Sequence, residues 1–127
     1  MGKIWVAYEP VWSIGVNGTP ATADYAEEMH KVIKGCLREI FGEEADKIPV
    51  LYGGSVNPGN ANELIVQPSI DGLFTGRAAW DADKFDKLIR DAKQPTKHSN
   101  RTSPVQSKIC LFDPLKIHIP LNSKAGQ

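Results

Sequence analysis

The chain has 127 residues, and its 15 basic residues balance its 15 acidic residues. It contains no signal peptide and no apolar run near membrane-spanning length, so we expect a soluble, cytoplasmic protein with no membrane partner. The two cysteines, Cys36 and Cys110, lie far apart and show no metal-ligand spacing, so we expect reduced thiols and no metal site.

Residues 1–92 alternate between short apolar runs and segments with helical periodicity. We expect strands near residues 4–9, 48–53 and 70–76, and helices near residues 22–41, 58–66 and 81–92. Strands separated by helical segments of this length pair in parallel through right-handed crossovers. The sequence therefore predicts an α/β fold with one parallel sheet of three strands.

Local signals indicate where each helix begins or ends. Thr22 is the expected N-cap of the first helix, and Gly42 its expected stop. Asn57 is the expected N-cap of the second helix, with Pro58 at the first helical position. Asp81 is expected to cap the third. Each helix carries an apolar stripe that needs a sheet to cover.

The first predicted strand ends in a carboxylate. Glu9 closes an apolar run and is followed by Pro-Val-Trp and a glycine-bearing loop. A glutamate at the mouth of a buried strand, beside a loop that can exclude water, has a raised pKa and can act as a general base. Taken alone, the fragment also fits a solvated turn residue.

The other two predicted strands end in glycine turns, Gly53-Gly-Ser55 and Gly76-Arg77. Glycines let the backbone approach an anion closely and point N–H groups at it, and a serine hydroxyl adds a donor. Ordinary strand-to-helix turns also favour these residues, so this alternative stays open. His30 lies in the first predicted helix, away from these loops, and we expect it to pack or to lie on the surface.

Four segments resemble the triosephosphate isomerase family in their order and spacing. They are Ala7-Tyr-Glu-Pro-Val-Trp12, Leu51-Tyr-Gly-Gly-Ser-Val56, Asn60-Ala-Asn-Glu-Leu64 and Gln67-Pro-Ser-Ile-Asp-Gly72. The resemblance covers residues 4 to about 92. A complete (β/α)8 barrel takes about 250 residues, so it implies a partial TIM barrel made of the last three βα units.

The resemblance implies a reaction and a lid. Glu9 would move a proton between neighbouring carbons, interconverting glyceraldehyde 3-phosphate and dihydroxyacetone phosphate through an enediol. Pro10, Val11 and Trp12 would form the hinge of a water-excluding lid. The N–H of Gly15, at the lid's tip, would donate to the substrate phosphate.

Further roles are implied at the other strand ends. Tyr52 would hold the lid closed through the backbone N–H of Ala21, while Ser55, Gly76 and Arg77 would complete the phosphate site. Tyr52 could instead be a packing residue at a strand end. Arg77 could instead be a surface arginine pointing to solvent.

Two features depart from the family pattern. The segment from Glu9 to Thr22 is one residue longer than usual, and Gly76-Arg77 stands where the family has two glycines. An arginine keeps the backbone donor and adds a fixed charge, but its bulk can reshape the pocket. Both features resemble an offshoot of the family that isomerises four-carbon tetrulose phosphates, which is the alternative substrate class.

Several parts that the family requires have no counterpart in the sequence. These are a lysine and an asparagine on the family's first strand, an electrophilic histidine on its fourth, and the region of its homodimer interface. Since the electrophile supplies the largest catalytic term, we expect this chain by itself to be inactive. A non-catalytic fragment that binds phosphate weakly is the second hypothesis. The expected partner is a small phosphorylated sugar, and we expect no cofactor.

The composition changes after residue 92. Residues 1–92 have 9 Lys or Arg against 14 Asp or Glu, whereas residues 93–127 have 6 against 1, with four prolines. This basic tail resembles no family, although residues 108–112 and 117–121 are short apolar runs that could be strands. Its cations are scattered without aromatic residues between them. We therefore expect a disordered, irregular end and no nucleic-acid partner.

Overall fold

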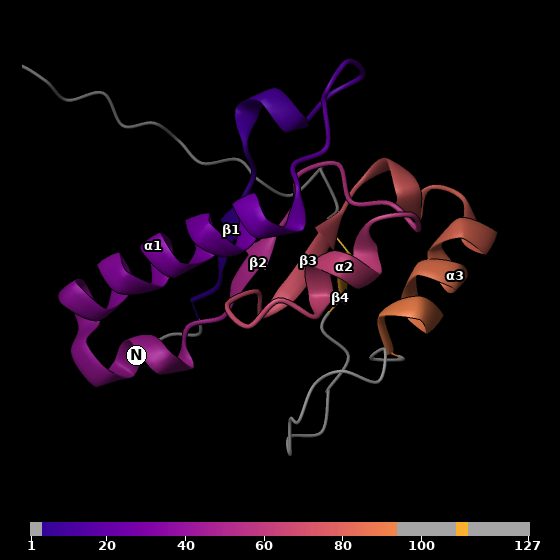
Figure 1. The fold of residues 1–127 in the computed structure, drawn as a ribbon. Coiled ribbons are helices and arrows are strands. Elements are labelled where there is room, and N and C mark those ends of the chain that lie inside the picture. The colour runs from indigo at the N-terminus through magenta and orange to yellow at the C-terminus, as the bar shows by residue number, and fades with distance from the viewer. Residues whose placement is uncertain (1–3, 94–108, 112–127) are drawn as a thin grey trace, which may run out of the picture.

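A computed structural model describes residues 4–93 and 109–111 of the chain. Four parallel strands form one sheet in the order β1-β2-β3-β4 (Figure 1). Their bounds are Val6–Tyr8, Val50–Tyr52, Gly72–Thr75 and Ile109–Leu111. The predicted α/β fold with a parallel sheet is confirmed. β4 falls within the run at residues 108–112 that the sequence left open as a strand. Of the other tail residues only Lys93, the last residue of α3, is described.

Three α-helices connect and cover these strands. They are α1 (Ala23–Phe41), α2 (Ala61–Ile65) and α3 (Ala82–Lys93), and short 3-10 turns occupy Val11–Ser13, Gly42–Lys47 and Arg77–Ala79. Figure 1 shows α1 and α2 in front of the sheet, with α3 beside α2. Within the described residues, no helix has the length and apolar character needed to cross a membrane.

The predicted caps of α1 and α3 are confirmed. Thr22 Oγ1 accepts a hydrogen bond from the backbone N–H of Tyr25 at 3.2 Å. Asp81 Oδ1 likewise accepts from the N–H of Lys84 at 3.0 Å. α1 ends at Gly42, whose φ of 59° lies in the left-handed region that glycine adopts most readily.

The second helix begins later than predicted. Residues 57–60 instead form a separate turn, in which the backbone carbonyl of Asn57 accepts from the N–H of Asn60 at 3.2 Å. The Asn57 side chain accepts from the N–H of Gly59 at 2.8 Å. Asparagine side chains compete with the helix in this way, so Asn57 caps a turn and α2 starts only at Ala61.

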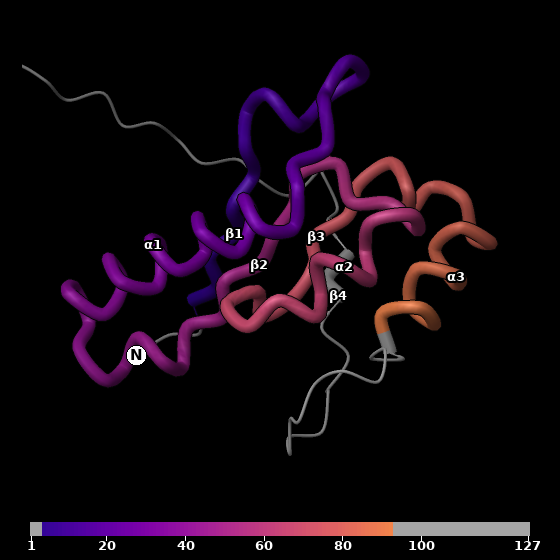
Figure 2. The backbone as a smooth tube through the Cα atoms, in the orientation of Figure 1, coloured from indigo at the N-terminus to yellow at the C-terminus, as the bar shows by residue number. Residues whose placement is uncertain are grey.

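The strand register brings three strand ends to one edge of the sheet. Tyr8 pairs with Tyr52, which pairs with Leu73. Glu9 and Gly53 follow immediately after their strands, and the turn at Gly76 follows β3. In Figure 2 the chain rises from β1 as an indigo loop away from the sheet before it enters α1. In α/β folds the crevice at the carboxyl ends of parallel strands is the usual ligand site.

The core lies between the sheet and the helices. Its largest fully buried apolar side chains are Tyr52, Leu64, Ile70, Leu73, Leu88 and Val50. His30 is fully buried among them, with its ring centroid 6.0 Å from that of Tyr8 and 5.9 Å from that of Tyr52. This confirms a packing role for His30.

Two carboxylates connect α1 to the segment that leads into β3, and the sequence did not reveal either role. Glu27, on α1, accepts hydrogen bonds from the backbone N–H and the hydroxyl of Ser69 at 2.8 and 2.9 Å. Asp71 accepts from the N–H of Val50 at 2.9 Å and pairs with Lys34 at 2.8 Å. Asp71 therefore links α1 to the starts of β2 and β3.

The buried histidine makes stability depend on pH. Burial lowers the pKa of His30, and Lys34 adds to this, while the Ser69 carbonyl, Asp71 and Glu27 oppose it. Below the ordinary pKa of about 6.5, the unfolded chain binds a proton that the folded chain excludes. The free energy of unfolding should therefore fall as the pH decreases from about 6.5 toward the folded pKa.

Urea denaturation between pH 5 and 8 tests this expectation. His30→Gln should flatten this part of the pH profile, although it lowers stability at every pH by disturbing the core. An identical pH slope in the variant and the unaltered chain would show that His30 is not responsible.

Candidate active site

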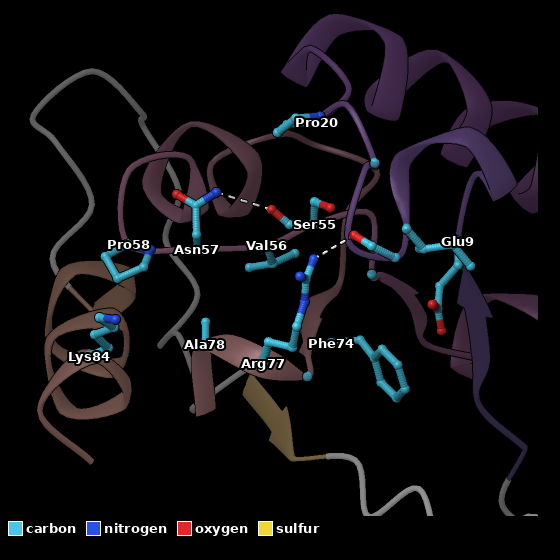
Figure 3. A pocket seen from close by; sticks show the side chains of 15 residues that line it. Glu9, Pro20, Ser55, Val56, Asn57, Pro58, Phe74, Arg77, Ala78 and Lys84 are labelled. Atoms are coloured by element: carbon cyan, nitrogen blue, oxygen red, sulfur yellow. Dashed lines mark hydrogen bonds between the residues drawn. The ribbon is translucent and has the colours of Figure 1, made fainter. Parts of the chain in front are cut away.

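An open cavity of about 690 Å³ lies at the carboxyl ends of β1, β2 and β3 (Figure 3). All five residues predicted to contact substrate line it: Glu9, Gly15, Ser55, Gly76 and Arg77. The other lining residues are Ile14, Gly18, Pro20, Gly53, Val56, Asn57, Pro58, Phe74, Ala78 and Lys84. The predicted hinge and latch residues, Pro10, Val11, Trp12, Ala21 and Tyr52, do not line the cavity.

Glu9 lies at the end of β1, where its side chain is exposed overall but its Cγ packs against Gly53. A Cβ atom at Gly53 would lie 2.8 Å from Glu9 Cγ and 2.8 Å from Phe74 Cδ1, so the glycine gives the glutamate room to pack. This burial raises the pKa of the Glu9 carboxyl above its ordinary value. A general base is most effective when its pKa lies near the working pH, so a raised pKa makes a carboxylate a better base near neutral pH. No other carboxylate lines the cavity in the described part of the chain.

The lid, residues 10–21, is a compact loop with its own hydrogen bonds. The Ser13 side chain is buried and donates to the carbonyl of Pro10 at 2.9 Å, and the N–H of Thr19 donates to the carbonyl of Trp12 at 3.2 Å. Gly15 has a φ of 87°, and a Cβ at Gly18 would overlap the carbonyl oxygen of Ser13. Glycine is therefore required at two points of the lid.

The predicted hinge forms the first turn of the lid. Val11 and Trp12 lie in the 3-10 turn that follows Pro10. The rings of Trp12 and Tyr25, which lies on α1, form an edge-type pair with a centroid distance of 5.4 Å. Val11 is 84% exposed, so its side chain contributes little packing here.

Two side chains predicted to bind phosphate are hydrogen-bonded to the lid. Ser55 Oγ donates to the carbonyl of Ser13. Arg77 Nη2 donates to the carbonyl of Gly15 at 2.5 Å, and a dashed line marks this bond in Figure 3. Arg77 is an exposed residue that lines the cavity, and its side chain joins the loop after β3 to the tip of the lid.

The loop after β2 is held by two asparagines whose roles the sequence did not reveal. Ser55 has a φ of 54°, unusual for a residue other than glycine. Its carbonyl accepts hydrogen bonds from Asn57 Nδ2 and Asn60 Nδ2, both at 3.1 Å. These bonds stabilise the left-handed backbone, and the spacing Ser-x-Asn-x-x-Asn is the signal that could have indicated them.

Tyr52 is fully buried and its hydroxyl lies beneath the lid. A Cβ at Gly54 would overlap Tyr52 Oη and lie 2.5 Å from Ser13 Oγ. Burial raises the pKa of Tyr52. The nearby Ser13 side chain and the Ala21 backbone act in the opposite direction and lower this pKa. Tyr52 Oη has no well-formed hydrogen bond to any described residue, so its predicted bond to Ala21 stays a prediction.

The charges around the cavity suit an anionic substrate. Figure 3 shows Glu9 and Lys84 on opposite sides, with Arg77 between them. Lys84, which the sequence did not indicate, comes from α3 and also pairs with Asp81 at 4.0 Å. Within the described residues, no group of three or more His, Cys, Asp or Glu side chains is placed to hold a metal ion. The cavity therefore combines one carboxylate, Glu9, with two cationic side chains and several glycine-bearing loops.

This combination of a parallel α/β fold and a cavity at the carboxyl ends of its strands is typical of part of a βα barrel. The family model of triosephosphate isomerase matches residues 1–92. The chain belongs to the triosephosphate isomerase family, as its motifs predicted.

Relatives in the family carry two different names. An L-erythrulose-1-phosphate isomerase of Rhizobium etli is 52% identical over 107 residues, which are 84% of this chain and 39% of the relative. An L-erythrulose-1-phosphate isomerase of Rhizobium meliloti is 62% identical over 87 residues, which are 68% of this chain and 33% of the relative. A triosephosphate isomerase of Endomicrobium trichonymphae is 46% identical over 88 residues, or 69% and 35%.

The chain spans between a third and two fifths of the length of these relatives. The match to the Rhizobium etli protein is longer than the segment that the family model covers, so it extends beyond residue 92. The sequence match to this relative therefore includes part of the basic tail.

Proposed function

We propose that this chain carries the base and the phosphate-binding part of an isomerase that interconverts aldose and ketose phosphates. The observation that supports this is the convergence of five residues from three separate strand ends, Glu9, Gly15, Ser55, Gly76 and Arg77, on one cavity. Membership of the isomerase family gives the class of reaction.

Glu9 removes a proton from the carbon next to the substrate carbonyl, which leaves an enediolate that becomes an enediol when the carbonyl oxygen takes up a proton. Glu9 then returns a proton to the former carbonyl carbon while the hydroxyl on the first carbon loses its proton, so the ketose becomes an aldose without net gain or loss of atoms. Burial supports this role because it raises the pKa of Glu9 toward the range in which a carboxylate exchanges protons readily. The phosphate binds at the far side of the cavity, through the backbone N–H groups of Gly15 and Gly76, the Ser55 hydroxyl and the Arg77 guanidinium.

We propose L-erythrulose 1-phosphate as the ketose. Its support is the name carried by the Rhizobium relatives, together with Arg77 and the longer lid. The triose phosphates are the second candidate, supported by the family and by the Endomicrobium relative.

Turnover of the two ketose phosphates tests the proposal. The assay uses the 127-residue chain and a fusion in which this chain replaces the matching part of the Rhizobium etli relative. The fusion should isomerise L-erythrulose 1-phosphate with a kcat/KM about tenfold or more above that for dihydroxyacetone phosphate, the size of effect expected from one extra carbon in a pocket. The chain alone should bind phosphate without turnover, because the family's electrophile has no counterpart in it.

The unaltered Rhizobium etli relative is the positive control. If that relative is active and the correctly folded fusion turns over neither substrate, the proposed function is wrong. If the fusion prefers dihydroxyacetone phosphate, the proposed isomerase reaction stands, but the substrate is the triose phosphate of the second candidate.

A further inference from the structure

The side chain of Arg77 connects two loops that lie 62 positions apart in the sequence. It begins the turn after β3, yet its guanidinium reaches the carbonyl of Gly15 at the tip of the lid, 2.5 Å away. Gly15 makes this possible, because its left-handed backbone needs a glycine. The position of the lid tip and the position of Arg77 are therefore fixed together.

Within the described residues, no carboxylate forms an ion pair with Arg77. The ion pairs of the described residues involve Lys31, Lys34, Arg38, Lys47, Lys84, Lys87 and Arg90, and they do not include Arg77. Its partner is an uncharged carbonyl, and it faces a cavity with Glu9 as the sole lining carboxylate among the described residues. A cation in this setting favours an anion in the cavity.

Arginine and serine differ in how many partners they can hold. The hydroxyl of Ser55 has one proton, which it gives to the carbonyl of Ser13, so it must release the lid to donate to a phosphate. A guanidinium has five N–H donors in a rigid fork, and Arg77 uses one of its terminal nitrogens for Gly15. It can therefore donate to the lid and to a phosphate at the same time.

We propose that Arg77 is a positioning residue that bridges the lid carbonyl of Gly15 and the phosphate of the substrate, so that phosphate binding holds the lid tip in place. This inference rests on the phosphate site of the proposed function and adds a mechanism for coupling that site to the lid. The Ser55 contact is exchanged when phosphate binds, whereas the Arg77 contact is retained.

Amide hydrogen exchange of residues 13–19 in the 127-residue chain, with and without inorganic phosphate, tests the bridge. The second readout is the fluorescence of Trp12, in a W5F/W80F background that leaves it as the only tryptophan. Arg77→Ala should speed exchange in the lid about tenfold or more without phosphate, because a hydrogen bond from a charged donor is lost. It should also abolish the protection that phosphate gives to the lid.

Two further variants separate charge from geometry. Arg77→Lys keeps the charge but not the fork, so it should retain most of the phosphate affinity and lose most of the phosphate-dependent lid protection. Arg38→Ala is the matched control, because this exposed arginine of α1 pairs with Asp46 and does not line the cavity. It should leave lid exchange unchanged.

Lid exchange in Arg77→Ala that equals that of the unaltered chain, with and without phosphate, would overturn the inference. Failure of phosphate to bind the unaltered chain would instead overturn the phosphate site, and with it the bridge. In that case faster exchange in Arg77→Ala without phosphate would still identify Arg77 as a lid contact.

Discussion

Replacing Glu9 with glutamine is expected to lower kcat/KM of the fusion about 10²- to 10⁴-fold, the usual contribution of a positioned general base. Glutamine has almost the same shape as glutamate and cannot accept a proton from carbon. The cavity provides no other carboxylate among the described residues that could substitute for it. The measurement is the rate at which solvent deuterium enters the substrate, followed by NMR, because this reports proton removal directly.

The same substitution should not lower stability. Burial raises the folded pKa of Glu9 above its ordinary value. Between these two pKa values the folded chain holds a proton that the unfolded chain has lost, so stability decreases as the pH rises through this window and stays lower above it. At pH 8 the variant should therefore unfold at the same or a higher urea concentration than the unaltered chain.

Glu39→Gln is the control for this pair of measurements, since Glu39 is an exposed residue of α1 far along the chain from the cavity loops. This control should change neither the rate at which deuterium enters the substrate nor the stability of the chain. Deuterium exchange at the original rate in Glu9→Gln would rule out Glu9 as the base. A marked loss of stability would show that the Glu9 carboxylate makes a favourable contact that its raised pKa does not reflect.

The placement of the site at one edge of the sheet could be predicted from the sequence. Glu9, the Gly53-Gly-Ser55 turn and the Gly76-Arg77 turn each follow an apolar run, and parallel strands bring such ends together. The helix caps at Thr22 and Asp81 could also be predicted from the sequence, because each depends on residues only three positions apart.

The contacts between the lid and the other loops could not be predicted in the same way. The bonds from Ser55 and Arg77 to lid carbonyls depend on the path of the lid, which the close approach of Gly18 to Ser13 determines. Sequence patterns describe which side chains can donate, but a backbone carbonyl occurs at every residue. Such an acceptor becomes specific only in the folded chain.

Buried polar residues were missed for a related reason. Glu27 lies on a helix whose sequence reads as an exposed charged face, yet it is 6% exposed and binds Ser69. The early start predicted for α2 arose from the opposite error, because Asn57 has good capping chemistry but uses it in a separate turn. In both cases a tertiary or local contact outweighed the average preference of the residue.

Gly54→Ala is expected to destabilise the chain by about 1–3 kcal/mol, the usual cost of overpacking a filled site. The new Cβ would overlap Tyr52 Oη and lie 2.5 Å from Ser13 Oγ, and both residues are fully buried. Gly54 is not among the glycines with positive φ, so the cost is steric. Displacing Ser13 also moves the carbonyl that Ser55 binds, so phosphate affinity and Trp12 emission should change together.

Gly35→Ala is the matched control, because a Cβ there meets nothing within 4 Å. Gly35 lies inside α1, where alanine should stabilise the chain by about 0.5–1 kcal/mol. Tyr52→Phe removes the hydroxyl that the new Cβ overlaps, so the double variant Gly54→Ala/Tyr52→Phe should be more stable than the sum of the two single changes predicts. Urea denaturation of the four chains gives this coupling. Strict additivity would mean that Gly54 is needed for some reason other than the space under the Tyr52 hydroxyl.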